Sequence, residues 1–264
     1  MGFYDLSKDE RQKIVFETEE AILSSIKSLN IVNNSIGIFP DGILKYASNS
    51  DTYMRKNAYM AIGRIYCDNE DLRENLLLVL DEMLGNSDEK VRQTAVYALG
   101  EIGKKDADSI LKIFERALKD KHHSVRNAVI GALKQMGQKN PEPTFKFAKK
   151  HLHDKDPKTR REIVHGIELR GRTHPEEVLP LLEELQDEKV KEVRNMVIHV
   201  IGQISYKTGC LERVVDSLNI WQNRKLVNDA VEEMLKVHKN YKFSARSPLE
   251  AEEYIKENLI DFNK

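Results

Sequence analysis

The sequence predicts an all-α protein in which about six pairs of helices follow one another along the chain. The segment Val91–Gly103 recurs around Val125–Gly137, at a step of 34 residues. In each copy the apolar residues stand three and four positions apart, which is the spacing of one buried helix face. The 264 residues include only 13 Gly, 7 Pro and 7% aromatic residues, which disfavours sheet folds with many tight turns.

The repeat extends well beyond these two copies. The step of 34 residues leads on to Arg160 and Arg194, and more weakly to Asn228. An earlier copy places Arg55 37 residues before Arg92, so its connecting loop is three residues longer. Six units are therefore expected between about residues 41 and 240.

Each unit divides into two helical patterns joined by a turn. In the second unit one apolar stripe runs over 72–83 and another over 91–102, with the turn Gly85–Asp88 between them. Asp88 is placed to cap the following helix, and in the fourth unit Asp156 does so with Pro157 at the first helical position. Because neither helix can bury its stripe alone, neighbouring units must cover one another.

The two ends of the chain carry helix-start signals of their own. Ser7 with Glu10 and Ser247 with Glu250 form capping-box patterns, which predict helices over about 8–29 and 248–260. Residues 30–42 are rich in Asn and Gly and are predicted to be a loop or linker. We expect a single domain over 1–264, made of an N-terminal helix and loop (1–40), the repeats (41–240) and a C-terminal capping helix (241–264).

The repeated motif resembles a known family. The pattern Val-Arg-x-x-Ala-x-x-Ala-Leu-Gly-x-Ile-Gly at 91–103, after an apolar helix and an Asp-bearing turn, is similar to HEAT repeats of the PBS-lyase-like kind. The resemblance covers about three-quarters of the chain and implies a right-handed α-α superhelix whose second helices line the concave face. Such solenoids serve as scaffolds, lyase subunits, transport adaptors and nucleic-acid binders, so the fold alone does not identify the function.

A narrower resemblance appears in the later units. The run His174–Leu179, followed by Asp187, Arg194 and Trp221, is similar to the HEAT-like DNA alkylation-repair proteins, which hold damaged duplex DNA on their concave face. The base-excising members use tryptophans with an adjacent catalytic Asp, whereas this chain has one Trp and no Trp-Trp-Asp run. The resemblance therefore implies a shape and no catalytic residue. A glycosylase remains an alternative, with Asp229 or Glu233 as the acid to test.

One arginine stands near the start of each second helix. As a phosphate clamp, the column would offer bidentate donors along a ridge. As structure, each Arg would bond to a turn Asp or carbonyl of its own or the next repeat. Because buried guanidinium groups are normally paired, we favour the structural ladder. The column comprises Arg55, Arg92, Arg126, Arg160 and Arg194, and the turn aspartates are Asp51, Asp88, Asp120, Asp154 and Asp187.

The distribution of charge is more informative than its total. The formal net charge is −1, but Lys119–Arg172 holds fourteen Lys and Arg against six Asp and Glu, a net of +8, and the rest of the chain holds −9. Six of the eight histidines stand between His122 and His174. A local basic segment is the expected electrostatic footprint of a polyanion partner, although a solvated charged face gives the same pattern.

The second-helix positions that miss the apolar stripe define a candidate binding face. Stepping by repeat gives a polar, amide-rich face that is mildly basic in its middle, where Arg161, His165 and His199 are expected to face one ligand or phosphate. A hydrated surface with no ligand is the competing interpretation. The candidate nucleic-acid-binding residues are Lys56, Arg64, Gln93, Tyr97, Asn127, Gln135, Lys158, Arg161, His165, Asn195 and His199.

Several classes of site and location are not expected. His122 with His123, and His151 with His153, lack further ligands at a recognisable spacing, so no metal site is predicted. No phosphate-binding Gly-rich loop or serine nucleophile elbow occurs, so no cofactor and no catalytic residue are assigned. The absence of a long apolar window and of a signal sequence, with only two separated cysteines, predicts a cytoplasmic protein without a membrane span.

The sequence therefore predicts a non-catalytic HEAT-repeat binding scaffold that engages nucleic acid or another polyanion through its basic central repeats. A DNA alkylation-repair glycosylase and a protein–protein adaptor are the alternatives. Nucleic acid and protein are thus the two partner classes, and Trp221 is expected to be a packing residue rather than a platform for a base.

Overall fold

The computed structural model describes residues 2–32 and 35–260, and its contacts divide the chain into two compact units, Met1–Asn140 (unit 1) and Pro141–Lys264 (unit 2). Each unit is described by itself. Unit 1 contains the elements η1 (Phe3–Asp5), α1 (Lys8–Lys27), β1 (Ile31–Val32), β2 (Ser35–Ile36), α2 (Asp41–Ala47), α3 (Thr52–Asp68), η2 (Glu70–Leu72), α4 (Arg73–Met83), α5 (Glu89–Gly103), α6 (Leu111–Leu118) and α7 (His123–Lys139). Unit 2 contains α8 (Pro141–His151), α9 (Pro157–Gly171), α10 (Pro175–Glu183), α11 (Lys191–Ser205), α12 (Cys210–Ile220), α13 (Arg224–Asn240) and α14 (Pro248–Asn258).

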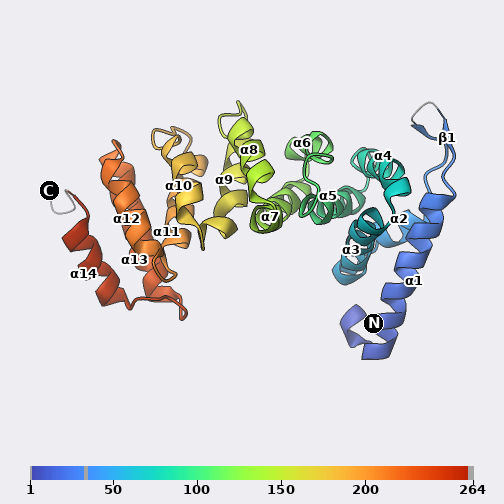
Figure 1. Ribbon diagram of the computed structural model, residues 1–264, viewed down its shortest axis with the longest axis horizontal. Coiled ribbons are helices and arrows are strands. Elements are labelled where there is room, and N and C mark those ends of the chain that lie inside the picture. The colour runs from blue at the N-terminus through green and yellow to red at the C-terminus, as the bar shows by residue number, and fades with distance from the viewer. Residues whose placement is uncertain (1, 33–34, 261–264) are drawn as a thin grey trace. The chain divides into compact units, whose positions relative to one another are not determined.

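Six helix pairs follow one another within the described residues, as the repeat predicted. The first helices are α2, α4, α6, α8, α10 and α12, and the second helices are α3, α5, α7, α9, α11 and α13. Within unit 1, α3 packs on α5 and α5 on α7; within unit 2, α9 packs on α11 and α11 on α13 (Figure 1). The second helices of each unit therefore present one continuous row of side chains.

The predicted apolar stripes form the core of these pairs. In the second unit of the repeat, Leu76, Leu80 and Met83 of α4 are fully buried, as are Leu99 and Ile102 of α5. The burial of such side chains removes apolar surface from water at about 25 cal/mol per Å². Since both helices of a pair and the helix of the next repeat contribute, each repeat depends on its neighbours for stability.

Helix starts lie where the capping residues predicted them. The side chain of Ser7 accepts a hydrogen bond from the Glu10 N–H at 3.3 Å, and Ser247 does the same for Glu250 at 3.3 Å. Asp156 caps α9 by accepting from the Lys158 N–H at 3.0 Å. The terminal helices end a little earlier than expected, α1 at Lys27 and α14 at Asn258. Both terminal helices pack on their repeats, α1 on α2 and α3, and α14 on α12 and α13.

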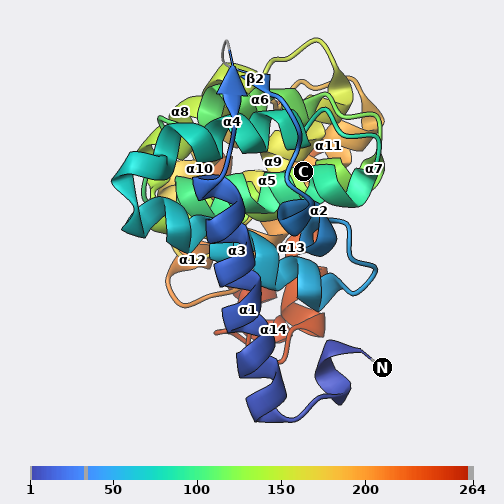
Figure 2. The same cartoon turned by 90° about the vertical axis from the view of Figure 1, so that its right-hand side faces the viewer.

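The segment 30–42 is not the simple loop that its composition predicted. Its described part contains the antiparallel strands β1 and β2, in which Ile31 pairs with Ile36, and α2 begins within it at Asp41. The Ile36 N–H donates to the carboxylate of Glu82 on α4 at 2.9 Å, and the Ile36 side chain is buried. Figure 2 shows β2 beside α4 and α1 in front of α3. The alternating apolar residues at 31, 32 and 36 carried the missed strand signal.

Candidate nucleic-acid interface

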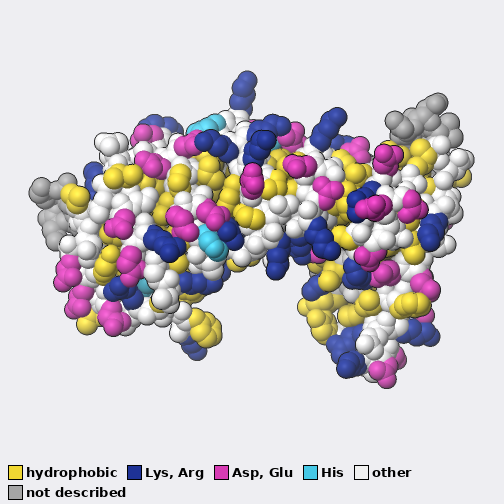
Figure 3. Space-filling view, viewed as in Figure 1, with side chains coloured by type: hydrophobic (Ala, Val, Ile, Leu, Met, Phe, Trp, Pro, Cys, Tyr) yellow, Lys and Arg dark blue, Asp and Glu magenta, His cyan; other side chains and the backbone are white. Residues whose placement is uncertain are grey.

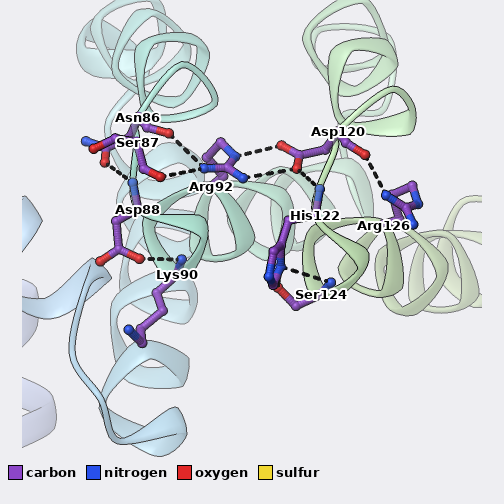
Figure 4. A network of polar contacts seen from close by, with 9 residues as sticks. All are labelled: Asn86, Ser87, Asp88, Lys90, Arg92, Asp120, His122, Ser124 and Arg126. Carbon is purple, nitrogen blue, oxygen red and sulfur yellow. Dashed lines mark hydrogen bonds and ion pairs between the residues drawn. The ribbon is translucent and has the colours of Figure 1, made fainter.

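The arginine column forms the structural ladder that the sequence favoured. The Arg92 guanidinium donates to the carbonyls of Asn86 and Ser87 at 2.9 and 3.0 Å, within its own repeat, and bidentately to Asp120 of the next repeat at 2.7 and 3.1 Å (Figure 4). The Asp120 carbonyl in turn accepts from Arg126 at 2.7 Å. Each guanidinium in this network therefore closes a turn and holds the next repeat.

The same arrangement recurs in unit 2. Arg160 donates to the carbonyl of Asp154 at 2.8 Å and to the carboxylate of Glu188 at 2.7 and 3.0 Å. Arg194 contacts Asp229 at 2.5 Å. The partner of Arg160 is thus Glu188 rather than the neighbouring Asp187 that the sequence suggested. The guanidinium groups of Arg92 and Arg160 are occupied by the fold, so the prediction of a structural ladder is confirmed and a phosphate clamp is not needed to explain the column.

Hydrogen bonding keeps the ladder carboxylates ionised despite their burial. Burial by itself opposes the charged form of Asp120, but the Arg92 guanidinium and the His122 N–H, which donates at 2.7 Å, outweigh it. The pKa of Asp120 therefore lies below its ordinary value. A carboxyl group whose pKa falls on folding stabilises the protein above the pKa of the unfolded chain, and this stabilisation is lost as the pH falls through the folded value.

The basic segment found in the sequence is partly neutralised by acids that lie outside it. Arg170 pairs with Glu177, Lys149 with Glu184 and Arg160 with Glu188, at 2.7, 3.4 and 2.7 Å. On the face shown in Figure 3, basic and acidic side chains alternate over unit 2. Within the described residues, six cations of the segment form no ion pair: Lys121, Lys139, Lys146, Lys155, Lys158 and Arg161.

Three of the candidate residues come together in unit 1. A hollow of about 400 Å³ lies over the second helices α3, α5 and α7 and is lined by side chains of all three. Lys56, Tyr97 and Gln135, each expected to bind, line it together. Its other lining residues are Tyr59, Met60, Gly100, Glu101, Lys104, Gly131 and Ala132. The volume falls within the range of small-molecule and nucleobase-sized sites.

Two tyrosine rings form the apolar wall of this hollow. Tyr59 of α3 and Tyr97 of α5 lie with their ring centroids 5.1 Å apart and tilted by 32°. Burial raises the pKa of Tyr59 to about 12, and the nearby Tyr97 and Glu101 add to the rise, so its phenol stays neutral at physiological pH. A side chain at Gly131 would place its Cβ 3.2 Å from the Tyr97 ring, so glycine leaves the ring its space.

Charge in the hollow is weakly positive. The Lys104 ammonium lies 2.7 Å from the Glu101 carboxylate and is neutralised by it. Lys56 is exposed and forms no ion pair with any residue in 2–32 or 35–260. An aromatic wall beside an unpaired lysine is the combination that sequence-tolerant binding of single-stranded nucleic acid uses.

The remaining candidates are spread over the second helices of the two units. Arg64 on α3 contacts Glu19 of α1 at 2.8 and 2.5 Å, so its guanidinium joins the terminal helix to the repeats. The Gln93 side chain accepts from Arg55 at 3.3 Å and donates to the Ser124 carbonyl at 3.3 Å. Asn127 is exposed on α7, Lys158 and Arg161 lie on α9, and Asn195 is exposed on α11.

In unit 2 the structure brings two predicted residues together with a carboxylate that the sequence reading missed. The His165 Nε2 atom of α9 lies 3.2 Å from a carboxylate oxygen of Glu168, and the His199 Nε2 atom of α11 lies 3.7 Å from the same oxygen. Glu168 is 1% exposed. The signal was present in the sequence, since Glu168 follows His165 by three residues and His199 follows by one repeat step of 34.

Trp221 is a packing residue, as expected. It is the C-cap of α12, its side chain is 1% exposed, and its indole N–H donates to the Ser217 hydroxyl at 3.3 Å. The ring therefore offers no open face to a base. Asp229, one of the two acids considered for base excision, is held by Arg194.

A second hollow lies on the outer side of unit 1, between the first helices α4 and α6. Its volume is about 520 Å³, and its apolar lining comes from Leu77, Leu78 and Ile113. At its rim Arg116 is paired with Asp81. This hollow contains no aromatic side chain, so it lacks the stacking surface of the one over α3, α5 and α7.

Comparisons with known proteins support the fold. Residues 76–162 match the family model of HEAT repeats, so the repeats expected from Val91–Gly103 are confirmed. AlkD2 from Streptococcus mutans aligns with a TM-score of 0.56 and 17% identity, over 74% of this chain and 94% of its own. The protein smu.31 from Streptococcus mutans UA159 gives 0.52 and 19%, over 67% of this chain and 92% of its own. At such identities the likeness shows the fold alone, and no curated protein matches the sequence.

No helix in the described part of the chain is long and apolar enough to cross a membrane.

Proposed function

We propose that this HEAT-repeat protein is a non-catalytic scaffold that binds single-stranded nucleic acid through its second helices. The observation that carries the proposal is the hollow over α3, α5 and α7, where the Tyr59 and Tyr97 rings lie 5.1 Å apart beside the unpaired Lys56. A base stacked on the Tyr97 ring would place its phosphate within reach of a flexible lysine at the rim. The Gln135 amide supplies a hydrogen-bonding group to a base edge without adding charge.

A single strand fits this site better than a duplex. The stacking faces of a duplex are occupied by neighbouring bases, whereas an unpaired base can leave the stack and use an aromatic wall. The cations that remain unpaired in the basic segment, among them Lys158 and Arg161 on α9, supply sequence-independent contacts to phosphates. The proposed contacts thus combine stacking in unit 1 with electrostatic attraction from both units.

Substitutions in the hollow separate stacking from general charge. Loss of one stacked base costs about 1–3 kcal/mol, so Tyr97→Leu should weaken binding of a single-stranded oligonucleotide about 5- to 150-fold. Tyr97→Phe, which keeps the aromatic face, should bind as the parent protein does. Lys56→Ala should reduce the slope of log affinity against log salt by about 0.7. Fluorescence anisotropy of a labelled oligonucleotide across a salt series measures all three.

Lys112, which lines the outer hollow of the same unit, provides the matched control. Lys112→Ala removes the same charge from unit 1 but leaves α3, α5 and α7 intact, so its binding and salt slope should be those of the parent protein. Equal losses in Lys56→Ala and Lys112→Ala would place binding on general surface charge. A parent protein that binds no oligonucleotide, but retains a protein through the apolar hollow of Leu77 and Ile113, would instead support the adaptor alternative.

A further inference from the structure

We propose that His165, Glu168 and His199 form a binding site for a divalent transition-metal ion of the zinc class. One ligand atom from each side chain lies within 4.8 Å of the other two, and the three residues come from the neighbouring helices α9 and α11 of unit 2. The proposal stands apart from nucleic-acid binding, since the hollow of Tyr97 belongs to unit 1.

The distances suit a tetrahedral ion. Zinc binds His nitrogen at about 2.0–2.1 Å and carboxylate oxygen at about 2.0–2.2 Å, which places tetrahedral ligand atoms about 3.3 Å apart. The carboxylate oxygen of Glu168 lies 3.2 Å from His165 Nε2 and 3.7 Å from His199 Nε2. The His199 side chain is 40% exposed, so its ring has room to close the remaining gap toward His165. Imidazole with carboxylate is a donor set that zinc accepts in proteins.

Surrounding polar groups hold the carboxylate in place. One oxygen of the buried Glu168 accepts a hydrogen bond from Arg172, and the other oxygen is the one turned toward the two histidines. Arg172 is itself anchored by Gln203 at 2.9 Å, and Gln203 accepts from the Tyr241 hydroxyl at 2.9 Å. This chain of contacts fixes a buried carboxylate before any ion binds, which reduces the cost of assembling the site.

A second carboxylate lies behind His199. The His199 Nδ1 atom is 3.9 Å from Glu233 of α13, on the side of the ring away from Glu168. Metal-binding histidines commonly donate their other ring N–H to a carboxylate, which orients the ring. Glu233 also offsets positive charge, because Arg172 and Lys236, which lies 3.7 Å from Glu233, already stand near the site. Glu233 is therefore assigned as a positioning residue and not as a ligand.

Metal binding to the full-length, tag-free chain tests the site. Chelator-stripped protein, dialysed against buffered Zn²⁺ and analysed for metal content, should bind one ion per chain. His199→Ala, which changes a half-exposed side chain, should weaken binding by more than about 100-fold, beyond the 10- to 100-fold range of supporting residues. Glu233→Gln should weaken it by about 10-fold. Co²⁺ should give the intense visible absorption of a four-coordinate site in the parent protein and in Glu233→Gln.

His153 supplies the matched control, because it lies in the same unit and contacts Glu184 at 2.9 Å, without a second histidine. His153→Ala should retain the ion with unchanged affinity. The proposal is overturned if His199→Ala binds zinc as well as the parent protein, or if the parent protein binds none. It is also overturned if bound Co²⁺ shows thiolate absorption, which would assign the ion to Cys67 or Cys210. Since Glu168→Gln removes a buried charge that pairs with Arg172, its loss of binding counts only if its circular dichroism is that of the parent protein.

Discussion

Arg92→Ala should lower the free energy of unfolding by about 3–5 kcal/mol. The Arg92 and Asp120 side chains are 6% and 10% exposed, so removal of the guanidinium leaves a carboxylate buried without its charged partner. The two carbonyls of Asn86 and Ser87 also lose their donor. The same residue thus closes a turn of one repeat and holds the next, and both contacts disappear together. Urea denaturation followed by circular dichroism measures the loss.

Arg116→Ala is the matched control for this effect. Arg116 also pairs with an aspartate of a neighbouring repeat, Asp81, but these side chains are 50% and 40% exposed. Exposed ion pairs contribute about 0–1 kcal/mol, so this substitution should change the stability little. Similar losses in Arg92→Ala and Arg116→Ala would show that the ladder has no special structural weight, and would reopen the phosphate-clamp interpretation of the arginine column.

Gly100→Ala should destabilise the protein by about 1–3 kcal/mol, although alanine is the better helix former. A Cβ atom at position 100 on α5 would lie 2.7 Å from the Cβ and 3.1 Å from the backbone Cα of Ala132 on α7. The backbone of α7 cannot give way locally, so the two helices must move apart. That movement would also widen the hollow that Tyr97 and Gln135 line, and thermal denaturation should show the loss of stability.

Gly103 lies one turn further along α5 and faces the same helix, which makes Gly103→Ala the control. Its added Cβ would meet the side-chain end of Met136, at 2.7 Å from Cε and 2.9 Å from Sδ. Methionine is flexible and can adopt another rotamer, so we expect no loss of stability beyond a few tenths of a kcal/mol. If both glycine substitutions are equally harmful, contact with the α7 backbone is not the cause.

Local sequence signals were sufficient to predict most of the fold. The step of 34 residues, the apolar spacing and the caps at Ser7, Asp156 and Ser247 located six helix pairs and both terminal helices. These signals act within one repeat or between neighbours, which is why a single sequence reveals them. The strands β1 and β2 were missed because residues 30–42 are rich in Asn and Gly, and because their main tether, the carboxylate of Glu82, stands 46 residues away from Ile36.

The site was predicted less completely, because charge partners cannot be read from composition. The sum of charges over 119–172 was correct, yet Glu177, Glu184 and Glu188 pair with its cations from outside that range. Repeat columns did identify Tyr97 and Gln135, but the wall formed with Tyr59 depends on how far each ring reaches across a helix pair. Glu168 was overlooked because it falls within a helix segment that is otherwise buried.

Cross-linking of a single-stranded oligonucleotide tests the proposed binding face most directly. A strand carrying 5-iodouracil, irradiated in complex with the protein at low salt, forms covalent bonds preferentially to aromatic side chains on which the base stacks. Peptide mapping should find the cross-link on Tyr97 or Tyr59, and the yield should fall as salt is added. Cross-links confined to the first helices, or a yield unchanged in Tyr97→Leu, would contradict binding through the second helices.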